Sequence, residues 1–216
     1  ICISKETKKN LIKIYKIKKK KISVIYLGGP ESKKKILRKR EKYILYVGSR
    51  SRYKNFNNLI NAFSESKYLI KNYKIVCYGG GKFNDNEIKN LEKLNIKRNI
   101  KYEEGDDTKL LSFYRNASLY VSLSDYEGFG LTLLEALRMD CPVLCSDIAV
   151  FREIYKKSCR YVKATNRRSI KNGIERILKS KTEQKKLSKQ SKIIIKQLTW
   201  KRCALDTSEV YKKILK

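Results

Sequence analysis

Histidine is absent from this chain of 216 residues, and its six cysteines form no CxxC pair. Zinc sites are usually built from these two residue types, so we expect no zinc site. The sequence also has no run of about 20 apolar residues, which a membrane-spanning helix needs, and no recognisable signal peptide. These absences predict a cytoplasmic location. The chain opens at Ile1 in the middle of a pattern, which we interpret as the start of a fragment.

Negative charge is scarce, because 21 acidic residues stand against 52 basic ones for a formal net charge of +31. Such an excess suggests a nucleic-acid or anionic-membrane partner. It is spread along the chain, however, and comes almost wholly from lysine, a bias that A/T-rich coding produces. No strand interleaves aromatic and basic residues as RNA platforms do, so we expect no nucleic acid. Peripheral contact with an anionic membrane, at its inner face, stays open as an alternative, with residues 16–21 as its best candidate.

Strand-like and helix-like segments alternate regularly from residue 43 onward. Strands are expected at 43–48, 74–81, 99–104, 118–123, 142–146 and near 160–163. Helices are expected at 55–66, near 84–94 and at 106–117, with two or three basic amphipathic helices in 166–216. This alternation predicts an α/β fold, a doubly wound, Rossmann-like parallel sheet that binds ligands at the carboxyl ends of its strands.

The chain ahead of this alternation shows a different pattern. Residues 1–21 are basic and look helical, with Ser4 and Thr7 as candidate caps. Residues 22–29 are expected to form a strand that ends in a turn, and the Lys-rich stretch 30–42 is expected to be a linker. The predicted organisation is therefore a segment of 1–29, a linker of 30–42 and a domain of 43–216.

The first candidate site lies in SDYEGFGLTLLEALRMDCPVLCS, from Ser124 to Ser146. Gly128 and Gly130 let the backbone approach a ligand closely, and the helix that follows them begins with free N–H groups that attract anions. Glu127 and Glu135, with seven residues between them, can face one crevice and accept hydrogen bonds from sugar hydroxyls. The alternative is an ordinary strand, turn and helix with two solvated glutamates.

The second candidate site is VGSRSRYKN, from Val47 to Asn55, which follows the first expected strand. Its side chains should therefore emerge at the same edge of the sheet as the EGFG turn. Arg50 and Lys54 there are suited to a diphosphate, arginine through its planar fork and lysine as a point charge. Arg52 has no assigned role. In a chain this basic, the position of these residues carries more weight than their identity.

Both segments resemble the family 4 retaining glycosyltransferases. In that family one strand ends in VG and is followed by an arginine and, a few residues later, by Lys-Asn or Lys-Gly. Another strand is followed by EGFGLP, a helix containing LEAM and a strand beginning with PV. Here the corresponding residues read EGFGL, LEAL and CPVL. The resemblance covers residues from about 43 to the end of the chain and, more weakly, 1–29. It implies the C-terminal, nucleotide-sugar-binding half of a two-domain GT-B architecture, with 1–29 as a remnant of the N-terminal acceptor domain and its crossover.

The resemblance also implies a reaction. A hexosyl unit would pass from a nucleotide diphosphate sugar to a glycan or lipid-linked acceptor, with retention at the anomeric carbon and without a metal or other cofactor. Acceptor contacts would come from the missing N-terminal domain, so the chain as given is expected to bind the donor but to be inactive alone. Polysaccharide biosynthesis is the setting that the resemblance suggests, while the base, the sugar and the acceptor stay unassigned.

Residue roles follow from the same resemblance. The catalytic group would be Glu127 at the donor hexose, with Arg50 and Lys54 at the diphosphate. The residues implied in donor binding are Glu135 at the ribose, and Gly128, Phe129, Gly130, Leu131, Gly79 and Gly80 around the sugar and phosphates. For Gly79 and Gly80, a tight turn after a strand explains the glycines about as well as ligand contact does.

The sequence departs from the family pattern at several positions. Leu123 and Thr132 stand where prolines are common, Asp140 stands where glycine is usual, and Lys156 and Lys157 replace a Gly-Asp pair. These departures suit a fast-drifting member or a degenerating one. Two alternatives therefore stay open: a non-catalytic module that binds a nucleotide sugar, and a basic binder of polyanions or membrane surfaces.

Overall fold

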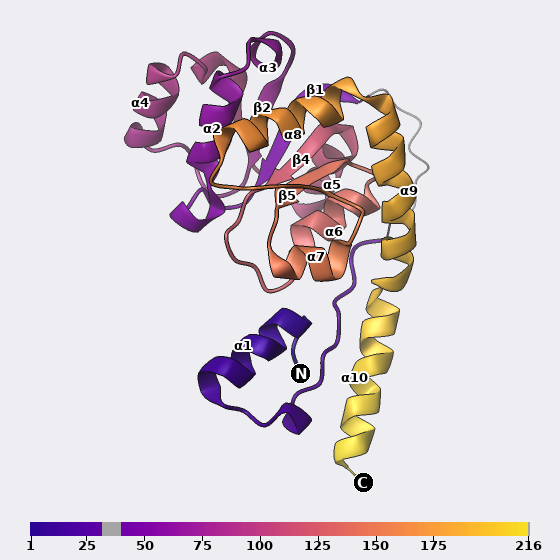
Figure 1. Ribbon diagram of the computed structural model, residues 1–216. Coiled ribbons are helices and arrows are strands. Elements are labelled where there is room, and N and C mark those ends of the chain that lie inside the picture. The colour runs from indigo at the N-terminus through magenta and orange to yellow at the C-terminus, as the bar shows by residue number, and fades with distance from the viewer. Residues whose placement is uncertain (32–39, 216) are drawn as a thin grey trace.

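The computed structural model describes residues 1–31 and 40–215. Its centre is a six-stranded sheet in which every pair of neighbouring strands is parallel (Figure 1). The strands are β1 (Glu41–Val47), β2 (Lys74–Tyr78), β3 (Ile100–Glu103), β4 (Ala117–Ser122), β5 (Val143–Ser146) and β6 (Arg160–Val162). The six strands expected from residue 43 onward are present with small shifts of their bounds. The Rossmann-like α/β fold is therefore confirmed.

The order of the strands decides where a ligand can bind. They run β3-β2-β1-β4-β5-β6 across the sheet, so the chain winds outward from β1 in one direction and then returns to the other side of β1 with β4. The connections beside β1 and β4 leave in opposite directions at this point, which opens a crevice beyond the carboxyl ends of these two strands. Both predicted site segments leave the sheet here.

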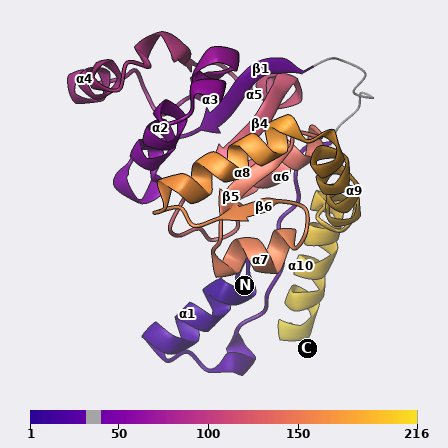
Figure 2. The same ribbon diagram turned by 45° about the horizontal axis from the view of Figure 1, so that its top comes forward.

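Helices cover both faces of the sheet. One core packs beneath α5 (Asp107–Asn116), α6 (Leu131–Arg138) and α7 (Ala149–Tyr155), and the other beneath α2 (Phe56–Ser64), α3 (Lys67–Asn72), α4 (Asp85–Lys93) and α8 (Arg167–Lys179). Figure 2 shows α8 lying across the strands near β5 and β6. The central strand explains this arrangement, because residues 43–46 are all buried, as in a sheet covered on both faces.

Local hydrogen bonds fix where several helices begin. Asn84 and Glu87 form a reciprocal capping box at α4, and the carboxylate of Asp106 accepts from the Lys109 N–H at α5. The helix expected over 55–66 instead ends at Ser64. The Ser66 hydroxyl accepts from the Leu69 N–H and starts the separate helix α3, which the sequence pattern did not predict.

The N-terminal segment differs in part from expectation. The helix α1 (Lys5–Tyr15) is present with Ser4 as its cap, and a short turn, η1 (Lys19–Lys21), follows it. The strand expected at 22–29 was wrong: Val24 makes one bridge with Cys2, and no further pairing in the described part of the chain extends the bridge into a strand. Ile22 and Ile25 are nonetheless buried, while Val24, Tyr26 and Leu27 are partly buried. Most of the predicted linker lies outside the described residues, and its last two positions belong to β1.

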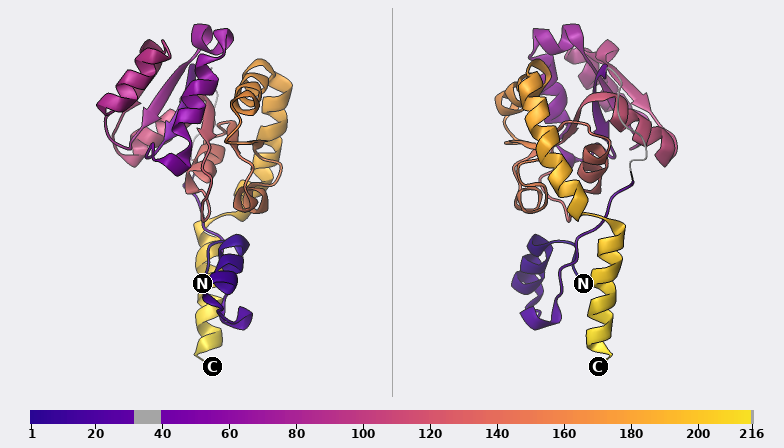
Figure 3. Two further views of the ribbon diagram at one scale, coloured as in Figure 1. Left: turned by 60° about the vertical axis from the view of Figure 1, so that its left-hand side comes forward. Right: turned by 90° about the vertical axis from the view of Figure 1, so that its right-hand side faces the viewer.

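Three helices close the chain, α8, α9 (Lys181–Gln197) and α10 (Trp200–Ile214). The helix α8 packs on the sheet and α9 packs against α6, α7 and α8, whereas α10 and α1 project from the same end of the domain (Figure 3). Neither α1 nor α10 contains a buried residue. None of the helices in the described ranges is both long enough and apolar enough to cross a membrane.

Candidate functional site

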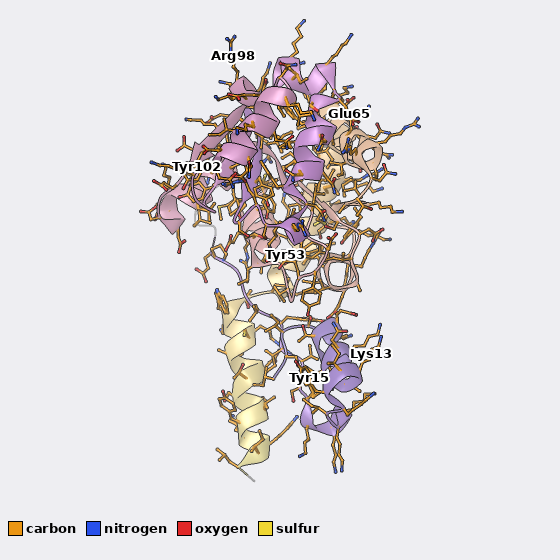
Figure 4. The ribbon with its side chains drawn as sticks, turned by 90° about the vertical axis from the view of Figure 1, so that its left-hand side faces the viewer. Lys13, Tyr15, Tyr53, Glu65, Arg98 and Tyr102 are labelled. Carbon is orange, nitrogen blue, oxygen red and sulfur yellow. The ribbon has the colours of Figure 1, made fainter. Side chains whose placement is uncertain are left out.

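A cavity of about 470 Å³ lies at the carboxyl ends of β1 and β4. Figure 4 shows Tyr53, in the short helix η2 (Arg52–Lys54), on the side of the domain that faces α1. The residues that line the cavity come from both predicted segments and from the N-terminal segment: Ile3, Leu27, Gly48, Ser49, Tyr53, Lys54, Ser122–Ser124 and Glu127–Thr132, with the ends of β1 and β4 beneath them.

Lys54 and Glu127 meet in this cavity. The Lys54 ammonium donates to Glu127 Oε1 at 2.5 Å, and the two side chains are 23% and 22% exposed. The Ser124 hydroxyl donates to the same carboxylate oxygen at 2.8 Å, and the ammonium lies 5.0 Å from the centre of the Tyr53 ring. The structure therefore brings together one predicted cation and one predicted carboxylate. They are the only oppositely charged pair among the described residues that line the cavity.

The start of α6 opens into the same cavity. Gly130 precedes the helix with a φ of 84°, and no side chain caps the helix start. The Tyr155 hydroxyl donates to the Gly130 carbonyl at 2.7 Å and fixes this turn from below. Leu131 and Thr132 follow it along the cavity wall, so their N–H groups lie where the helix dipole favours an anion. Gly128, Gly130 and Leu131 all line this cavity, and their role in donor binding stays a prediction.

Phe129 lines the cavity but is itself only 2% exposed. Its ring packs against Tyr26 and Tyr155, with ring centres 6.2 and 6.4 Å away. The side chain therefore anchors the EGFG turn in the core, and only its backbone is available to a ligand.

Glu135 lies apart from the residues that line the cavity. It sits on α6, and the Tyr114 hydroxyl of α5 donates to its Oε2 at 3.0 Å. Burial raises the pKa of the Glu135 carboxyl, and the hydrogen bond from Tyr114 only partly opposes this effect. Glu135 is therefore not among the residues that line the cavity with Glu127, although the sequence analysis expected both to face one crevice.

Arg50 is also directed away from the cavity. Its guanidinium pairs with Glu87 through Nε at 2.7 Å and Nη2 at 3.2 Å, and Nη2 also donates to the carbonyls of Gly81 and Lys82. The group stacks on Phe83, 4.5 Å from its ring centre. Burial acts to raise the pKa of Glu87, but hydrogen bonds from Arg50 and from the backbone hold that pKa below its usual value. The predicted diphosphate pair is therefore divided: Lys54 faces the cavity and Arg50 does not.

The glycines after β2 form a turn with left-handed backbone, with φ of 70° at Gly79 and 76° at Gly80. A Cβ on Gly80 would lie 2.4 Å from the carbonyl oxygen of Gly48, so the two turns pack backbone against backbone. A Cβ on Gly79 would meet no atom within 4 Å. Packing explains Gly80, while Gly79 has open space where a side chain would be; neither glycine is among the residues that line the cavity.

Several residues of the site were not predicted from the sequence. Ser124 stands three residues before Glu127 and Tyr53 directly before Lys54, so their proximity in the motifs was the available signal. Ile3 and the Arg50 partner Glu87 had no such signal, because each lies far along the chain from its contacts. No group of carboxylate and cysteine side chains in residues 1–31 and 40–215 is arranged to hold a metal ion.

Comparison with protein families matches residues 28–193 to the model described as "Glycosyl transferases group 1". The chain is 31% identical over 183 residues to the O-antigen chain mannosyltransferase RfbU of Salmonella typhimurium, which covers 82% of this chain and 50% of the relative. It is 29% identical to the uncharacterized glycosyltransferase MJ1607 of Methanocaldococcus jannaschii, covering 98% of this chain and 59% of the relative. The chain spans about half the length of such relatives.

Solved structures match the fold. A glycosyltransferase from Rickettsia africae superposes with a TM-score of 0.85 at 20% identity, over 99% of this chain and 62% of the other. Anabaena HepE in complex with UDP and glucose gives a TM-score of 0.85 at 13% identity, over 98% of this chain and 62% of the other. The sequence matches carry the family assignment, which agrees with the resemblance seen in the motifs. The chain belongs to the glycosyl transferases of group 1.

Proposed function

We propose that this chain is the donor-binding part of a retaining, metal-independent glycosyltransferase that takes a hexosyl unit from a nucleotide diphosphate sugar. The observation that carries this proposal is the Lys54–Glu127 pair, which faces the same cavity as the uncapped start of α6. A cation, a carboxylate and free backbone N–H groups are the three kinds of partner that a sugar diphosphate needs.

The chemistry follows from where charge develops. Departure of the nucleoside diphosphate leaves negative charge on its outer phosphate, and fixed positive groups aimed at that position lower the barrier. Lys54 and the N–H groups of Leu131 and Thr132 supply such groups at the cavity. When a donor binds, the Lys54 ammonium exchanges Glu127 for a phosphate oxygen, and the freed carboxylate accepts from hydroxyls of the hexose.

The acceptor would be a glycan or a lipid-linked glycan. Relatives that match this chain include the O-antigen chain mannosyltransferase B of Escherichia coli and the poly(glycerol-phosphate) alpha-glucosyltransferase of Bacillus subtilis. Acceptor contacts would come from protein outside this chain, so turnover requires that partner half. Contact with an anionic membrane through residues 16–21, whose side chains are exposed, stays a prediction.

Calorimetric titration of the chain with UDP, GDP and ADP in the presence of EDTA tests the donor site. We expect one of the three nucleotides to bind selectively without metal, and Lys54→Ala to weaken that binding. Lys97→Ala is the matched control, because it removes a lysine from an exposed ion pair with Glu92, away from the cavity. Failure of all three nucleotides to bind the folded chain would contradict the proposal. Salt-sensitive binding to heparin that Lys54→Ala leaves unchanged would favour the polyanion binder instead.

A further inference from the structure

A second cavity, of about 460 Å³, is lined by residues from α7 and the turn after it, from β6 and from the first turns of α9. No described residue lines both this cavity and the one that holds Lys54 and Glu127. Five of the nine described residues in its lining are basic and one is acidic, so we call it the basic cavity. The basic residues are Arg152, Lys156, Lys157, Arg160 and Lys186.

Both arginines of the basic cavity are held in place. Arg152 donates to the two oxygens of Asp147 at 2.6 and 2.8 Å and stacks on Tyr161, 3.9 Å from the ring centre. Arg160 donates to Glu183 Oε1 at 3.4 Å. A guanidinium that is already fixed loses little side-chain entropy when an anion binds.

The three lysines of the basic cavity have no such partners. Within residues 1–31 and 40–215, its two arginines are the only lining cations that make ion pairs, and the ammonium groups of Lys156, Lys157 and Lys186 have no carboxylate partner. All three side chains are exposed. Five cations therefore share two carboxylates, those of Asp147 and Glu183, and an anion would neutralise the excess.

Lys156 also has a strained backbone. Its φ is 46° and its ψ is −113°, a region that side chains other than that of glycine rarely adopt. Strain of this kind is concentrated at functional sites, where the surrounding structure maintains it. Lys156 and Lys157 are the pair that replaces Gly-Asp in the family pattern, so this chain carries both the strain and the two added charges at one turn.

The chemistry of the basic cavity favours phosphate groups. Arginine binds two phosphate oxygens through its fork, and lysine binds phosphate as a point charge. The helix dipoles oppose each other here, because α7 ends at the cavity while Glu183 lies in the first turn of α9, so the side chains decide the charge. Tyr161 is the one aromatic residue in the described lining, and its ring already stacks with Arg152. A nucleobase would therefore find little to stack on.

We propose that the basic cavity binds an anion with two or more phosphate groups, either free in solution or in the headgroup of a lipid. Lys156, Lys157 and Lys186 contact the phosphates, and the two fixed arginines stand beside them. Its volume is within the range of small-molecule sites. The site is separate from the donor cavity, and this inference does not rest on the proposed function.

Calorimetric titration with inorganic tripolyphosphate tests the site, in about 0.15 M salt, where the Debye length of about 8 Å limits diffuse attraction. The titrated chain carries Lys54→Ala, which removes the cation of the donor cavity. We expect Lys156→Gly combined with Lys157→Ala to weaken tripolyphosphate binding about tenfold, or ~1.4 kcal/mol. No binding by the folded parent chain, or equal affinities of parent and variant, would overturn the proposal.

Lys196→Ala combined with Lys201→Ala is the matched control. These lysines line another cavity, of about 400 Å³, in which Arg202 is the only other basic residue of the described lining. The control loses the same charge and should bind tripolyphosphate as the parent chain does. Equal losses in the two double variants would mean that the anion responds only to the net charge of +31, and would overturn the proposal.

Lys156→Gly alone separates binding from folding. The strain that it relieves is at least as large as the entropy that a glycine costs, so its unfolding temperature should not fall. Weaker binding by this equally stable chain would show that the ammonium group holds the anion. Parental affinity would exclude Lys156 from the site and overturn the proposal.

Vesicles distinguish the two sources of phosphate. If the ligand is a headgroup, phosphatidylcholine vesicles that contain cardiolipin should bind the chain, and the variant with Lys156→Gly and Lys157→Ala should lose that binding. Binding of tripolyphosphate without binding of vesicles would identify a free anion and support the same site. A chain that binds tripolyphosphate but no nucleotide would contradict the proposed function alone.

Discussion

Lys54 and Glu127 are separated by 73 positions in the sequence, yet their charged groups lie 2.5 Å apart. The segment after β1 carries Lys54 and the segment after β4 carries Glu127, and these strands are neighbours at the point where the winding of the sheet reverses. The contact thus depends on the fold being doubly wound. Without a ligand the two residues satisfy each other, and a donor has to offer a partner to both.

Lys54→Ala should reduce the affinity for the nucleoside diphosphate by about 10- to 100-fold, since a hydrogen bond to a charged group contributes ~1.5–3 kcal/mol. The pair is partly exposed in the free protein, so its loss should change the free energy of unfolding by only about 0–1 kcal/mol. Calorimetry and urea unfolding measure the two effects separately. Equal affinities of Lys54→Ala and the wild type would show that Lys54 does not bind the nucleoside diphosphate.

Gly130→Ala should destabilise the chain by about 2 kcal/mol or more, because strained backbone and overpacking each cost of order 1–3 kcal/mol. The new Cβ would lie 2.5 Å from Phe151 Cε1, at a residue with a φ of 84°. Gly79→Ala is the matched control, since its φ is 70° but no atom lies within 4 Å of the new Cβ. Gly79→Ala should lose only the free energy that the strained backbone costs. In urea unfolding it should therefore be clearly more stable than Gly130→Ala. Equal losses would show that packing against Phe151 contributes nothing.

The fold could be predicted well from the sequence because short, local sequence patterns determine most of its strands and helices. Residues 43–46 form a short apolar run of the kind that a fully covered parallel strand needs, and acidic or Asn caps mark helix starts such as Asp106. The strand expected at 22–29 was wrong because the prediction used the local pattern alone. Ile25 is apolar and buried, but a strand also requires a partner with free backbone groups, and within residues 1–31 and 40–215 this segment pairs only through the bridge between Cys2 and Val24.

The site was less predictable because side-chain direction depends on distant residues. Lys54 and Arg50 lie on one turn after β1, and nothing local distinguishes them. Glu87, 37 positions away, directs Arg50 toward the glycine turn, while Glu127 receives Lys54. The direction of the Glu135 side chain likewise depends on Tyr114, its hydrogen-bond partner on another helix.

Glu135→Gln should stabilise the chain near neutral pH and have no effect in acid. Burial raises the pKa of Glu135 in the folded protein, so between its unfolded pKa of about 4.3 and its folded pKa the folded state binds more protons than the unfolded state. The stability of the wild type therefore falls as pH rises through this interval. Glutamine carries no charge and avoids that loss.

Thermal unfolding of the wild type and Glu135→Gln across pH measures this difference. The variant should unfold at a higher temperature above the folded pKa of Glu135, where each kcal/mol corresponds to about 2–4 °C for a chain of this size. The two curves should converge below about pH 4, where the carboxyl is protonated in both states. Glu175→Gln is a control of opposite sign, because hydrogen bonds from Lys179 and Ser66 lower the pKa of Glu175. A wild type more stable than Glu135→Gln at neutral pH would mean that the Tyr114 bond outweighs the cost of burial.

Glu153→Gln should loosen the N-terminal segment. One carboxylate oxygen of Glu153 accepts from the Lys5 N–H at 2.7 Å and from the Tyr26 hydroxyl at 2.8 Å, and the other accepts from the Glu6 N–H at 3.0 Å. Glu153 of α7 therefore caps the start of α1, alongside Ser4. An amide keeps the size but places an NH₂ group where one of these donors points, so at least one bond is lost, at about 1–3 kcal/mol.

Hydrogen exchange read by mass spectrometry should show faster exchange across α1 in Glu153→Gln, with the sheet unchanged. Glu6→Gln makes the same chemical change on α1 itself, where the carboxylate has only a 4.0 Å contact with Lys9, and should leave exchange as in the wild type. Ile3 lines the cavity, and its Cδ1 would lie 3.2 Å from a Cβ added at Gly128, so loosening this segment should also weaken nucleotide binding. Unchanged exchange in α1 would mean that packing, and not the Glu153 carboxylate, holds the segment against the domain.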